Sequence, residues 1–235
     1  MIKLYQFPPP PNFPNFSPYC VKLETYLKIA QIPYTNVFTL NLSKNPKKLM
    51  PYIELDGQII GDSSFIIDKM IELHGDLVDN WLTPEQQALR VVFERLFENH
   101  LTQIMVYFRW VHPEGWSQFR EIIFHGSPKL IKIFIGNWWV KKIGSRLRGA
   151  PAVGNFSADE LLRRAKKDFD ALSAYLGDKP FMFGDKISTI DGLMLAVFGG
   201  IACVPVETPL KELAVQYENL KNHSLRLLST YYPGE

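Results

Sequence analysis

A serine and a cysteine lie one helical turn apart in the tetrapeptide Ser17-Pro18-Tyr19-Cys20. Serine is a favoured helix N-cap and proline is favoured at the first helical position, so a helix is expected to begin here. The free N–H groups and the dipole at a helix N-terminus stabilise a thiolate or another anion. A hydroxyl and a thiol at such a tip indicate sulfur chemistry, although a plain helix cap explains the same tetrapeptide.

The predicted elements around this tetrapeptide follow a definite order. An apolar run over residues 3–7 predicts a strand, and apolar residues at helical spacing from Cys20 to Ala30 predict a helix. A second extended run covers residues 35–40, and Asp56-Gly57 between two apolar runs predicts a β-hairpin. A further helix is expected from residue 62 to Gly75. This β-α-β then β-β-α order is that of a thioredoxin-like fold.

These segments resemble the N-terminal domain of the glutathione transferase superfamily. The match lies in the Ser-Pro-Tyr-Cys helix start, in Met50-Pro51 before the hairpin and in Asp62-Ser63-x-x-Ile66. The resemblance implies a cis peptide bond before Pro51, with the backbone of Met50 facing the cysteinyl part of glutathione. It also implies that Asp62 and Ser63 hold the γ-glutamyl end. A carboxylate can pair with the γ-glutamyl ammonium, while Ser63 and the helix N-terminus receive the γ-glutamyl carboxylate.

The second half of the chain carries a separate resemblance. Residues 181–195 read FMFGDKISTIDGLML, in which Ser188-x-x-Asp191 resembles the capping motif of the superfamily's helical domain. Several stretches, among them SPYCVKLETYLKIAQIPY and GNFSADEL, are most similar to the Fax and metaxin-type branch. We therefore expect a thioredoxin-like glutathione-binding domain over residues 1–75 and an all-helical domain over 83–235 that carries the electrophile side of the site.

Composition excludes several other classes of protein. The chain has 235 residues, and its net charge of +2 is too mild to indicate nucleic acid; basic clusters at 141–148 and 163–167 are typical of solvated helix faces. Two cysteines are too few for a disulfide scaffold and indicate a reducing compartment. The apolar stretch 192–206 is shorter than the roughly 20 residues that a bilayer requires and predicts a buried helix. Without a visible export signal, we expect a cytoplasmic protein with no membrane anchor. Scattered histidines give metal binding little support.

The function that the resemblance implies is a detoxifying glutathione S-transferase. Glutathione would be a co-substrate whose thiolate attacks a small hydrophobic electrophile such as an epoxide, a halide or an unsaturated carbonyl. A free thiol has a pKa near 8.5, and a Ser17 hydroxyl together with a helix dipole could lower it by about one or two units. Tyr5 on the first strand and a backbone N–H remain alternatives for this role. Tyr19 is expected to pack or to line the site, and Cys20 to pack as a small apolar residue.

Two further groups complete the predicted site. The glycine carboxylate of glutathione should meet a basic residue, for which Lys44, Lys47 and Lys48 are candidates and Lys48 is preferred. The electrophile should lie between the loop 8–16 and the first long helix of the second domain. The aromatic residues proposed to line that pocket, which are equally typical of a core, are Tyr107, Trp110, His112 and Trp116.

Two rival functions belong to other classes. A glutathione-transferase-like interaction module without catalysis is one, as some metaxin-type relatives are. A monothiol reductase using Cys20 is the other, and it requires Cys20 to be reactive. The resemblance also implies a homodimer.

Overall fold

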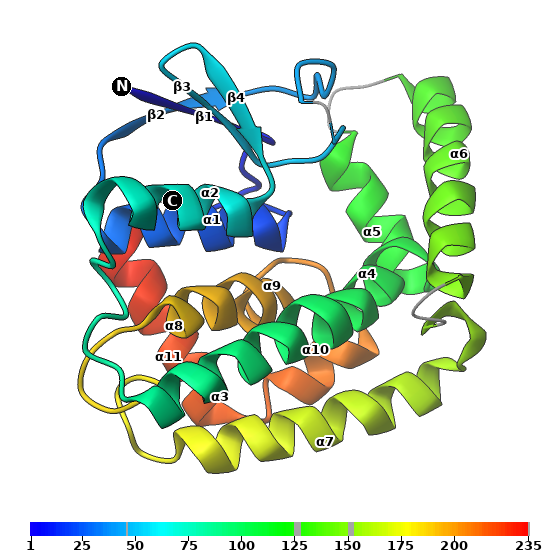
Figure 1. Ribbon diagram of the computed structural model, residues 1–235. Coiled ribbons are helices and arrows are strands. Elements are labelled where there is room, and N and C mark those ends of the chain that lie inside the picture. Colours follow the sequence, from blue (N-terminus) through cyan, green and yellow to red (C-terminus); the bar gives the residue numbers. More distant parts are fainter. Residues whose placement is uncertain (46, 125–127, 150–152, 235) are drawn as a thin grey trace.

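The computed structural model describes residues 1–45, 47–124, 128–149 and 153–234. Its sheet has the strand order β2-β1-β3-β4 (Figure 1). Strand β1 pairs with β2 in parallel and with β3 antiparallel, and β3 pairs antiparallel with β4. The strands are β1 (Ile2–Gln6), β2 (Tyr34–Phe38), β3 (Tyr52–Leu55) and β4 (Gln58–Gly61). The predicted thioredoxin-like order is confirmed.

The hairpin between β3 and β4 turns at the predicted Asp-Gly pair. Asp56 has φ 49° and Gly57 has φ 80°. Positive φ at both central residues is the two-residue turn whose twist matches that of the flanking strands. The turn sets Tyr52 opposite Gly61, and so fixes where each strand ends.

Two helices, α1 (Pro18–Ile29) and α2 (Ser63–His74), cover one face of this sheet (Figure 1). Their apolar sides meet the sheet in one buried cluster, in which Leu4 and Ile53 come from the strands, Leu27 from α1 and Ile66 from α2. Each of these side chains is 0% exposed. The burial of apolar area on both helices therefore holds the two helix N-termini in fixed places against the sheet.

The rest of the chain is helical. Its helices are α3 (Pro84–Arg95), the π-helical segment η1 (Leu96–Leu101), α4 (Thr102–Trp110), α5 (Pro113–Ile123), α6 (Lys129–Arg148), the 3₁₀ turn η2 (Val153–Asn155), α7 (Ala158–Leu176), α8 (Thr189–Met194), the π-helical segment η3 (Leu195–Gly199), α9 (Gly200–Ala202), α10 (Pro209–Ala214) and α11 (Glu218–Tyr231). The predicted long helix is present as α3-η1-α4. It starts at a capping box, where Thr83 Oγ1 accepts from Gln86 N. The π-helical turn in its middle had no signal in the sequence.

A buried helical run, α8-η3-α9, lies in the core of the helical part. All its residues from Ile190 to Ala202 are buried, as predicted for this stretch, although the helix ends at Ala202 instead of continuing to residue 206. Pro205 lacks the backbone donor that a longer helix needs. The run begins at the predicted cap, where Asp191 Oδ2 accepts from Ser188 N at 2.8 Å and Asp191 Oδ1 accepts from Met182 N at 2.8 Å.

Helix α1 packs directly on this run and joins the two halves of the molecule. A Cβ at Gly192 would lie 3.0 Å from Thr25 Cγ2, so glycine permits the close approach of α8 to α1. The hydroxyls of Thr25 and Tyr232 lie 2.8 Å apart. Within the described part of the chain, no helix has both the length and the apolar content needed to cross a bilayer.

Candidate active site

The proline-rich loop after β1 delivers Ser17 to the N-terminus of α1. Ser17 has an extended backbone (φ −83°, ψ 118°), and its carbonyl accepts from Cys20 N and Val21 N. Pro18 occupies the first helical position, as predicted. The Ser17 side chain makes no capping hydrogen bond to the backbone. Its hydroxyl, on a half-buried residue, is therefore not consumed by the helix that it begins.

Cys20 lies one turn further along α1 and is fully buried. Burial raises the pKa of the Cys20 thiol to about 12, although hydrogen bonds from the Ser17 side chain and the Phe7 backbone act in the opposite direction. The thiol packs with Tyr5, Met50 and Tyr52. A neutral, enclosed thiol matches the expected packing role, and it removes the basis of the monothiol reductase hypothesis.

A buried asparagine fixes the loop immediately before Ser17. Asn15 is 1% exposed; its Nδ2 donates to Phe7 O at 2.7 Å, and its Oδ1 accepts from Ser17 N at 3.0 Å. Behind it, Gln6 Nε2 donates to Glu24 Oε2 at 2.8 Å. The sequence analysis did not single out Asn15. Its signal was available, because asparagine two residues ahead of a helix start commonly bonds the backbone in an Asx turn.

The sheet register brings the other predicted binding segments to the same edge. Tyr5 pairs with Tyr52 and Tyr52 pairs with Gly61. The end of β1, the start of β3 and the end of β4 therefore lie side by side, and they lead into the Ser17 loop, the Met50-Pro51 step and Asp62. The Met50–Pro51 peptide bond is cis, as the resemblance implied.

Asp62 and Ser63 begin α2 at this edge. Asp62 has φ 84°, and its Oδ1 accepts from Ser64 N at 3.0 Å. Ser63 is buried, with 3% of its surface exposed. A helix N-terminus with free N–H groups beside a half-exposed carboxylate can receive both the carboxylate and the ammonium of an amino acid.

The candidate lysines lie on the loop that precedes Met50. Lys48 Nζ donates to Ser43 O at 2.8 Å within its own loop. Lys47 Nζ instead lies 3.9 Å from Asp62 Oδ2 and 4.0 Å from the centre of the Phe65 ring. Lys47 is therefore the lysine that faces the start of α2, whereas the preferred candidate, Lys48, has its ammonium turned back onto the loop.

The two tyrosines near the site make other contacts. Tyr5 OH donates to Glu54 Oε2 at 2.9 Å, and this hydrogen bond raises the pKa of Tyr5 above its usual value. Burial, helped by the negative charge of Glu98, raises the pKa of Tyr19. A tyrosine that activates a thiol by donating a proton or a hydrogen bond needs a free hydroxyl, and the Tyr5 hydroxyl is occupied by Glu54.

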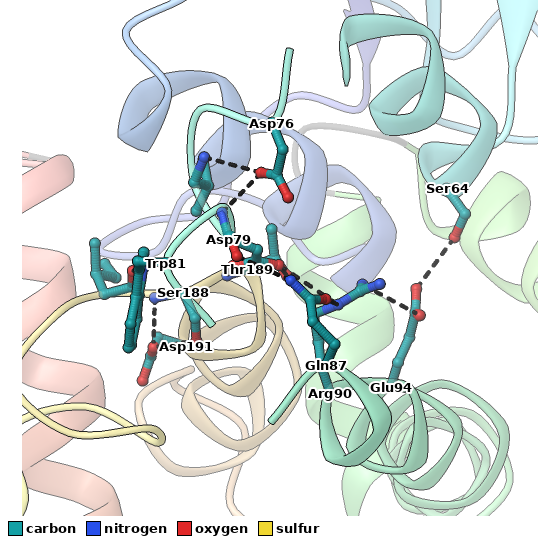
Figure 2. Close-up of polar contacts among 12 residues, drawn as sticks. Ser64, Asp76, Asp79, Trp81, Gln87, Arg90, Glu94, Ser188, Thr189 and Asp191 are labelled. Atoms are coloured by element: carbon teal, nitrogen blue, oxygen red, sulfur yellow. Dashed lines mark hydrogen bonds and ion pairs between the residues drawn. The ribbon is translucent and has the colours of Figure 1, made fainter. Parts of the chain in front are cut away.

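A buried cation links α1 to the helical part just beneath the start of α2. Lys22 Nζ lies 2.7 Å from Glu94 Oε1, 2.7 Å from Glu98 Oε1 and 2.9 Å from Ser64 Oγ. Figure 2 shows how the network continues: Ser64 contacts Glu94, and Glu94 contacts Arg90. The N-terminus of α2 is thus held by charges from α1 and α3.

The same network reaches the cap of the buried helix. In Figure 2, Arg90 extends to Asp79, which also accepts from Thr189 N at 2.8 Å. Asp79 belongs to the connector between α2 and α3, and Thr189 is the first residue of α8. The connector, the candidate site and the helical core are therefore joined by one continuous series of polar contacts.

The four predicted pocket residues divide into two pairs. Trp110 and Trp116 stack at 5.5 Å and 20°, and Trp110 also contacts Phe119 at 5.1 Å. Phe119 in turn meets Phe16 edge-on at 4.8 Å, so this pair reaches the residue before Ser17. Tyr107 and His112 each lie 5.3 Å from the buried ring of Phe108. His112 Nδ1 is buried without a hydrogen-bond partner among the residues described.

Comparison with known proteins identifies the family to which this fold belongs. Residues 18–115 match the model of the glutathione S-transferase N-terminal domain, and residues 165–227 match that of the glutathione S-transferase C-terminal domain. Among solved structures, CsGST63524 of Ceriporiopsis subvermispora, a glutathione S-transferase in complex with glutathione, has a TM-score of 0.64 at 17% identity and covers 100% of this chain and 98% of that one. A likeness at this identity shows the fold.

Three curated proteins are more similar to this chain in sequence than that solved structure is. The chain is 31% identical to isoprene-epoxide–glutathione S-transferase of Rhodococcus sp. (strain AD45), over 87% of this chain and 88% of that protein. It is 30% identical to Failed axon connections of Drosophila melanogaster over 99% of this chain, but it spans only 58% of that protein's length. It is 26% identical to the mitochondrial outer membrane import complex protein METAXIN of Arabidopsis thaliana, over 94% of this chain and 69% of that protein. The chain belongs to the glutathione S-transferase family, in the branch that contains Failed axon connections and the metaxins.

Proposed function

We propose that this chain is a glutathione S-transferase that activates the glutathione thiol and conjugates it to a small hydrophobic electrophile. The observation that carries the proposal is the convergence of three segments at one edge of the sheet: Ser17 at the start of α1, cis Met50-Pro51, and Asp62-Ser63 at the start of α2. Together they supply a hydroxyl, a backbone surface and a charged helix terminus at the same edge of the sheet.

Ser17 is the proposed activating residue. Its hydroxyl makes no capping bond and contacts the Cys20 thiol, a weak acceptor, so it can turn to donate to the glutathione sulfur, while the N-terminus of α1 favours negative charge there. The γ-glutamyl group would bind at Asp62 and Ser63, and the cysteinyl backbone would bind along Met50 and Pro51. For the glycine carboxylate we retain Lys48, the candidate from the sequence, whose ammonium would have to leave Ser43 O; Lys47 pairs with Asp62, at the proposed γ-glutamyl end of the site.

The electrophile is proposed to bind against the aromatic side chains of α4 and α5. Trp110 and Trp116 are the better-supported pair, since their cluster reaches Phe16 beside Ser17. Tyr107 and His112 would take part from the neighbouring side of Phe108. The name of the Rhodococcus relative supports an epoxide as the first electrophile to try.

A second candidate function is a non-catalytic glutathione-transferase-like interaction module. The similarity to a mitochondrial import protein and to Failed axon connections favours it. The two functions differ in what they require of Ser17: an enzyme needs its hydroxyl, whereas an interaction module does not.

We further propose a homodimer in the cytoplasm, with domains spanning residues 1–75 and 83–235. Exposed apolar side chains on α2 and α3 support self-association: Phe65 is 57% exposed, Val91 42% and Val92 62%. Two free cysteines support a reducing compartment. Sedimentation should show a dimer that Val92→Asp dissociates; a monomeric wild-type protein would contradict the proposal.

Conjugation of glutathione to a small epoxide or unsaturated carbonyl tests the enzymatic function. Ser17→Ala should reduce the rate by roughly 10²-fold, the lower range for losing one positioned proton donor. Tyr5→Phe is the matched control, because it also removes one hydroxyl, but one that is bonded to Glu54; its rate should stay within about twofold. Equal losses in the two variants, or no wild-type conjugation with any of these electrophile classes, would contradict the proposal.

A further inference from the structure

Arg109 on α4 is a buried cation to which the proposed reaction assigns no role. Its side chain lies in the interior, with 5% of the residue exposed. One guanidinium nitrogen donates to Phe16 O at 2.9 Å, and the other donates to Gly200 O. A Cβ at Gly200 would come within 3.3 Å of the guanidinium, so a glycine at that position leaves space for it.

Within the part of the chain that the structure describes, the charge of Arg109 has no carboxylate partner. No ion pair to Asp or Glu is found for it among the described residues; its contacts are carbonyl oxygens and the face of Phe119, 5.7 Å away. Burial lowers the pKa of Arg109 to about 10, so the guanidinium remains charged at neutral pH. Burying an unpaired cation is unfavourable unless a negative charge is placed near it.

Arg109 contacts the peptide unit that joins Phe16 to Ser17, the proposed activating residue. The carbonyl of Phe16 accepts from Arg109, and the N–H on the other side of the same peptide unit, that of Ser17, donates to Asn15 Oδ1 at 3.0 Å. Both polar groups of this peptide unit, its C=O and its N–H, are therefore hydrogen-bonded. Asn15 holds it from the loop, and Arg109 holds it from the helical part of the molecule, 93 residues away in sequence.

We propose that Arg109 is a positioning residue that fixes Ser17 and stabilises a negative charge at the N-terminus of α1. In the enzyme this charge would be the glutathione thiolate, so the inference rests on the proposed function. At an effective dielectric constant near 20, two unit charges about 10 Å apart change one another's pKa by about 1 unit. The helix dipole alone would then not account for the whole effect.

Other titratable and charged groups also face this helix end and must be the same in all variants that are compared. On α1 they are Tyr19, Glu24 and Cys20, of which Cys20 is replaced by alanine in every variant of the test; from the other elements they are Glu98 of η1, Asp62 before α2 and Arg146 of α6. Variants that differ only at residue 109 leave all of these groups unchanged.

The experiment places a titratable thiol where the anion is expected. In a background carrying Ser17→Cys, Cys20→Ala and Cys203→Ser, the introduced thiol is the only one in the chain, and no disulfide can form with residue 20. The pH dependence of its alkylation by iodoacetamide gives its pKa. Arg109→Gln should raise this pKa by about 1 unit, whereas Arg109→Lys, which keeps the charge, should change it by less than about 0.3 unit.

Two outcomes would overturn the inference. One is an unchanged thiol pKa in Arg109→Gln that still shows the parent circular dichroism spectrum. The other is a full-unit rise in Arg109→Lys, which decides the matter if Arg109→Gln does not fold. Because no glutathione is present, this test can fail while glutathione binds to the wild-type protein, and it can succeed where glutathione does not bind.

Discussion

Replacing Lys22 with methionine should destabilise the protein strongly, because this lysine is the central cation of the buried cluster beneath α2. Its side chain is 6% exposed, and its Nζ lies 2.7 Å from both Glu94 Oε1 and Glu98 Oε1. Methionine has a similar length and no charge. The variant therefore leaves two neighbouring carboxylates in place; their remaining cationic partners among the described residues are the outer arginines, Arg90 at 4.0 Å from Glu94 and Arg95 at 3.6 Å from Glu98.

The structure allows the size of this effect to be worked out. Removing one member of a buried ion pair costs about 3–5 kcal/mol, and the lower end applies here because the arginines remain. A loss of about 3 kcal/mol corresponds to a fall in melting temperature of about 6–12 °C for a chain of this length. The effect should depend on pH. Burial pushes the pKa of Glu94 up, but the charge and hydrogen bond of Lys22, together with the charges of Arg90 and Arg95, outweigh burial and hold this pKa below its usual value.

The direction of that pH dependence follows from the lowered pKa. A carboxyl group whose pKa is lower in the folded state contributes stability above its unfolded pKa of about 4.5, and the contribution is lost as the pH falls through the folded value. The difference between wild type and Lys22→Met should therefore be complete at pH 7 and should shrink below about pH 4.5.

Urea unfolding followed by tryptophan fluorescence measures the change. Lys69→Met on α2 is the matched control: its ion pair within the described part of the chain is with the exposed Glu72, so its loss should cost no more than about 0.5 kcal/mol. Adding Glu98→Gln to Lys22→Met should restore at least about 1 kcal/mol, since one uncompensated charge disappears. A loss below about 1 kcal/mol in Lys22→Met, or no recovery in the double variant, would refute this reasoning.

Three further predictions concern buried polar groups. Iodoacetamide at pH 7.5 should label Cys203 and leave Cys20 unmodified, because burial raises the pKa of Cys20 to about 12; early Cys20 labelling in peptide mass spectra would contradict this. Asp168→Asn should raise the melting temperature at pH 7 but not at pH 4. Burial raises the pKa of Asp168, so its contribution to stability is lost as the pH rises through the folded value; equal shifts at both pH values would argue against it. Asp191→Ala should lower the free energy of unfolding by about 3 kcal/mol or more, because Asp191 accepts hydrogen bonds from Met182, Ser188 and His223. The control, Ser157→Ala at an exposed helix cap, should lower it by about 1 kcal/mol. Equal losses of the two variants in urea unfolding would be inconsistent with this account.

The parts of the fold that could be predicted have local causes. The Asp56-Gly57 turn and the capping boxes at Thr83 and Ser157 are each determined by residues within a few positions of one another. The buried helix after Ser188 could be predicted because an uninterrupted apolar run has nowhere to lie except the core. The resemblance assigned Ser17, Met50-Pro51 and Asp62 to one site, and the register of the sheet places the segments that carry them at one edge.

The parts that could not be predicted depend on contacts between distant residues. Lys22 has the sequence surroundings of any lysine on an amphipathic helix, and its partners lie 72 and 76 residues away. Arg109 contacts Phe16 from 93 residues away. The choice between Lys47 and Lys48 depends on the path of a single loop, which repeating patterns do not determine. Such residues are identified only when the helices are packed against one another.

The most direct test of the proposed function is calorimetric titration of glutathione into the wild-type protein and Ser17→Ala, with thiolate absorbance near 240 nm recorded in parallel. We predict that both proteins bind glutathione and that only the wild type generates thiolate at neutral pH. Equal thiolate in the two proteins would show that Ser17 is not the activating group. Failure of the wild-type protein to bind at millimolar glutathione would contradict the enzymatic function and leave the interaction module in its place.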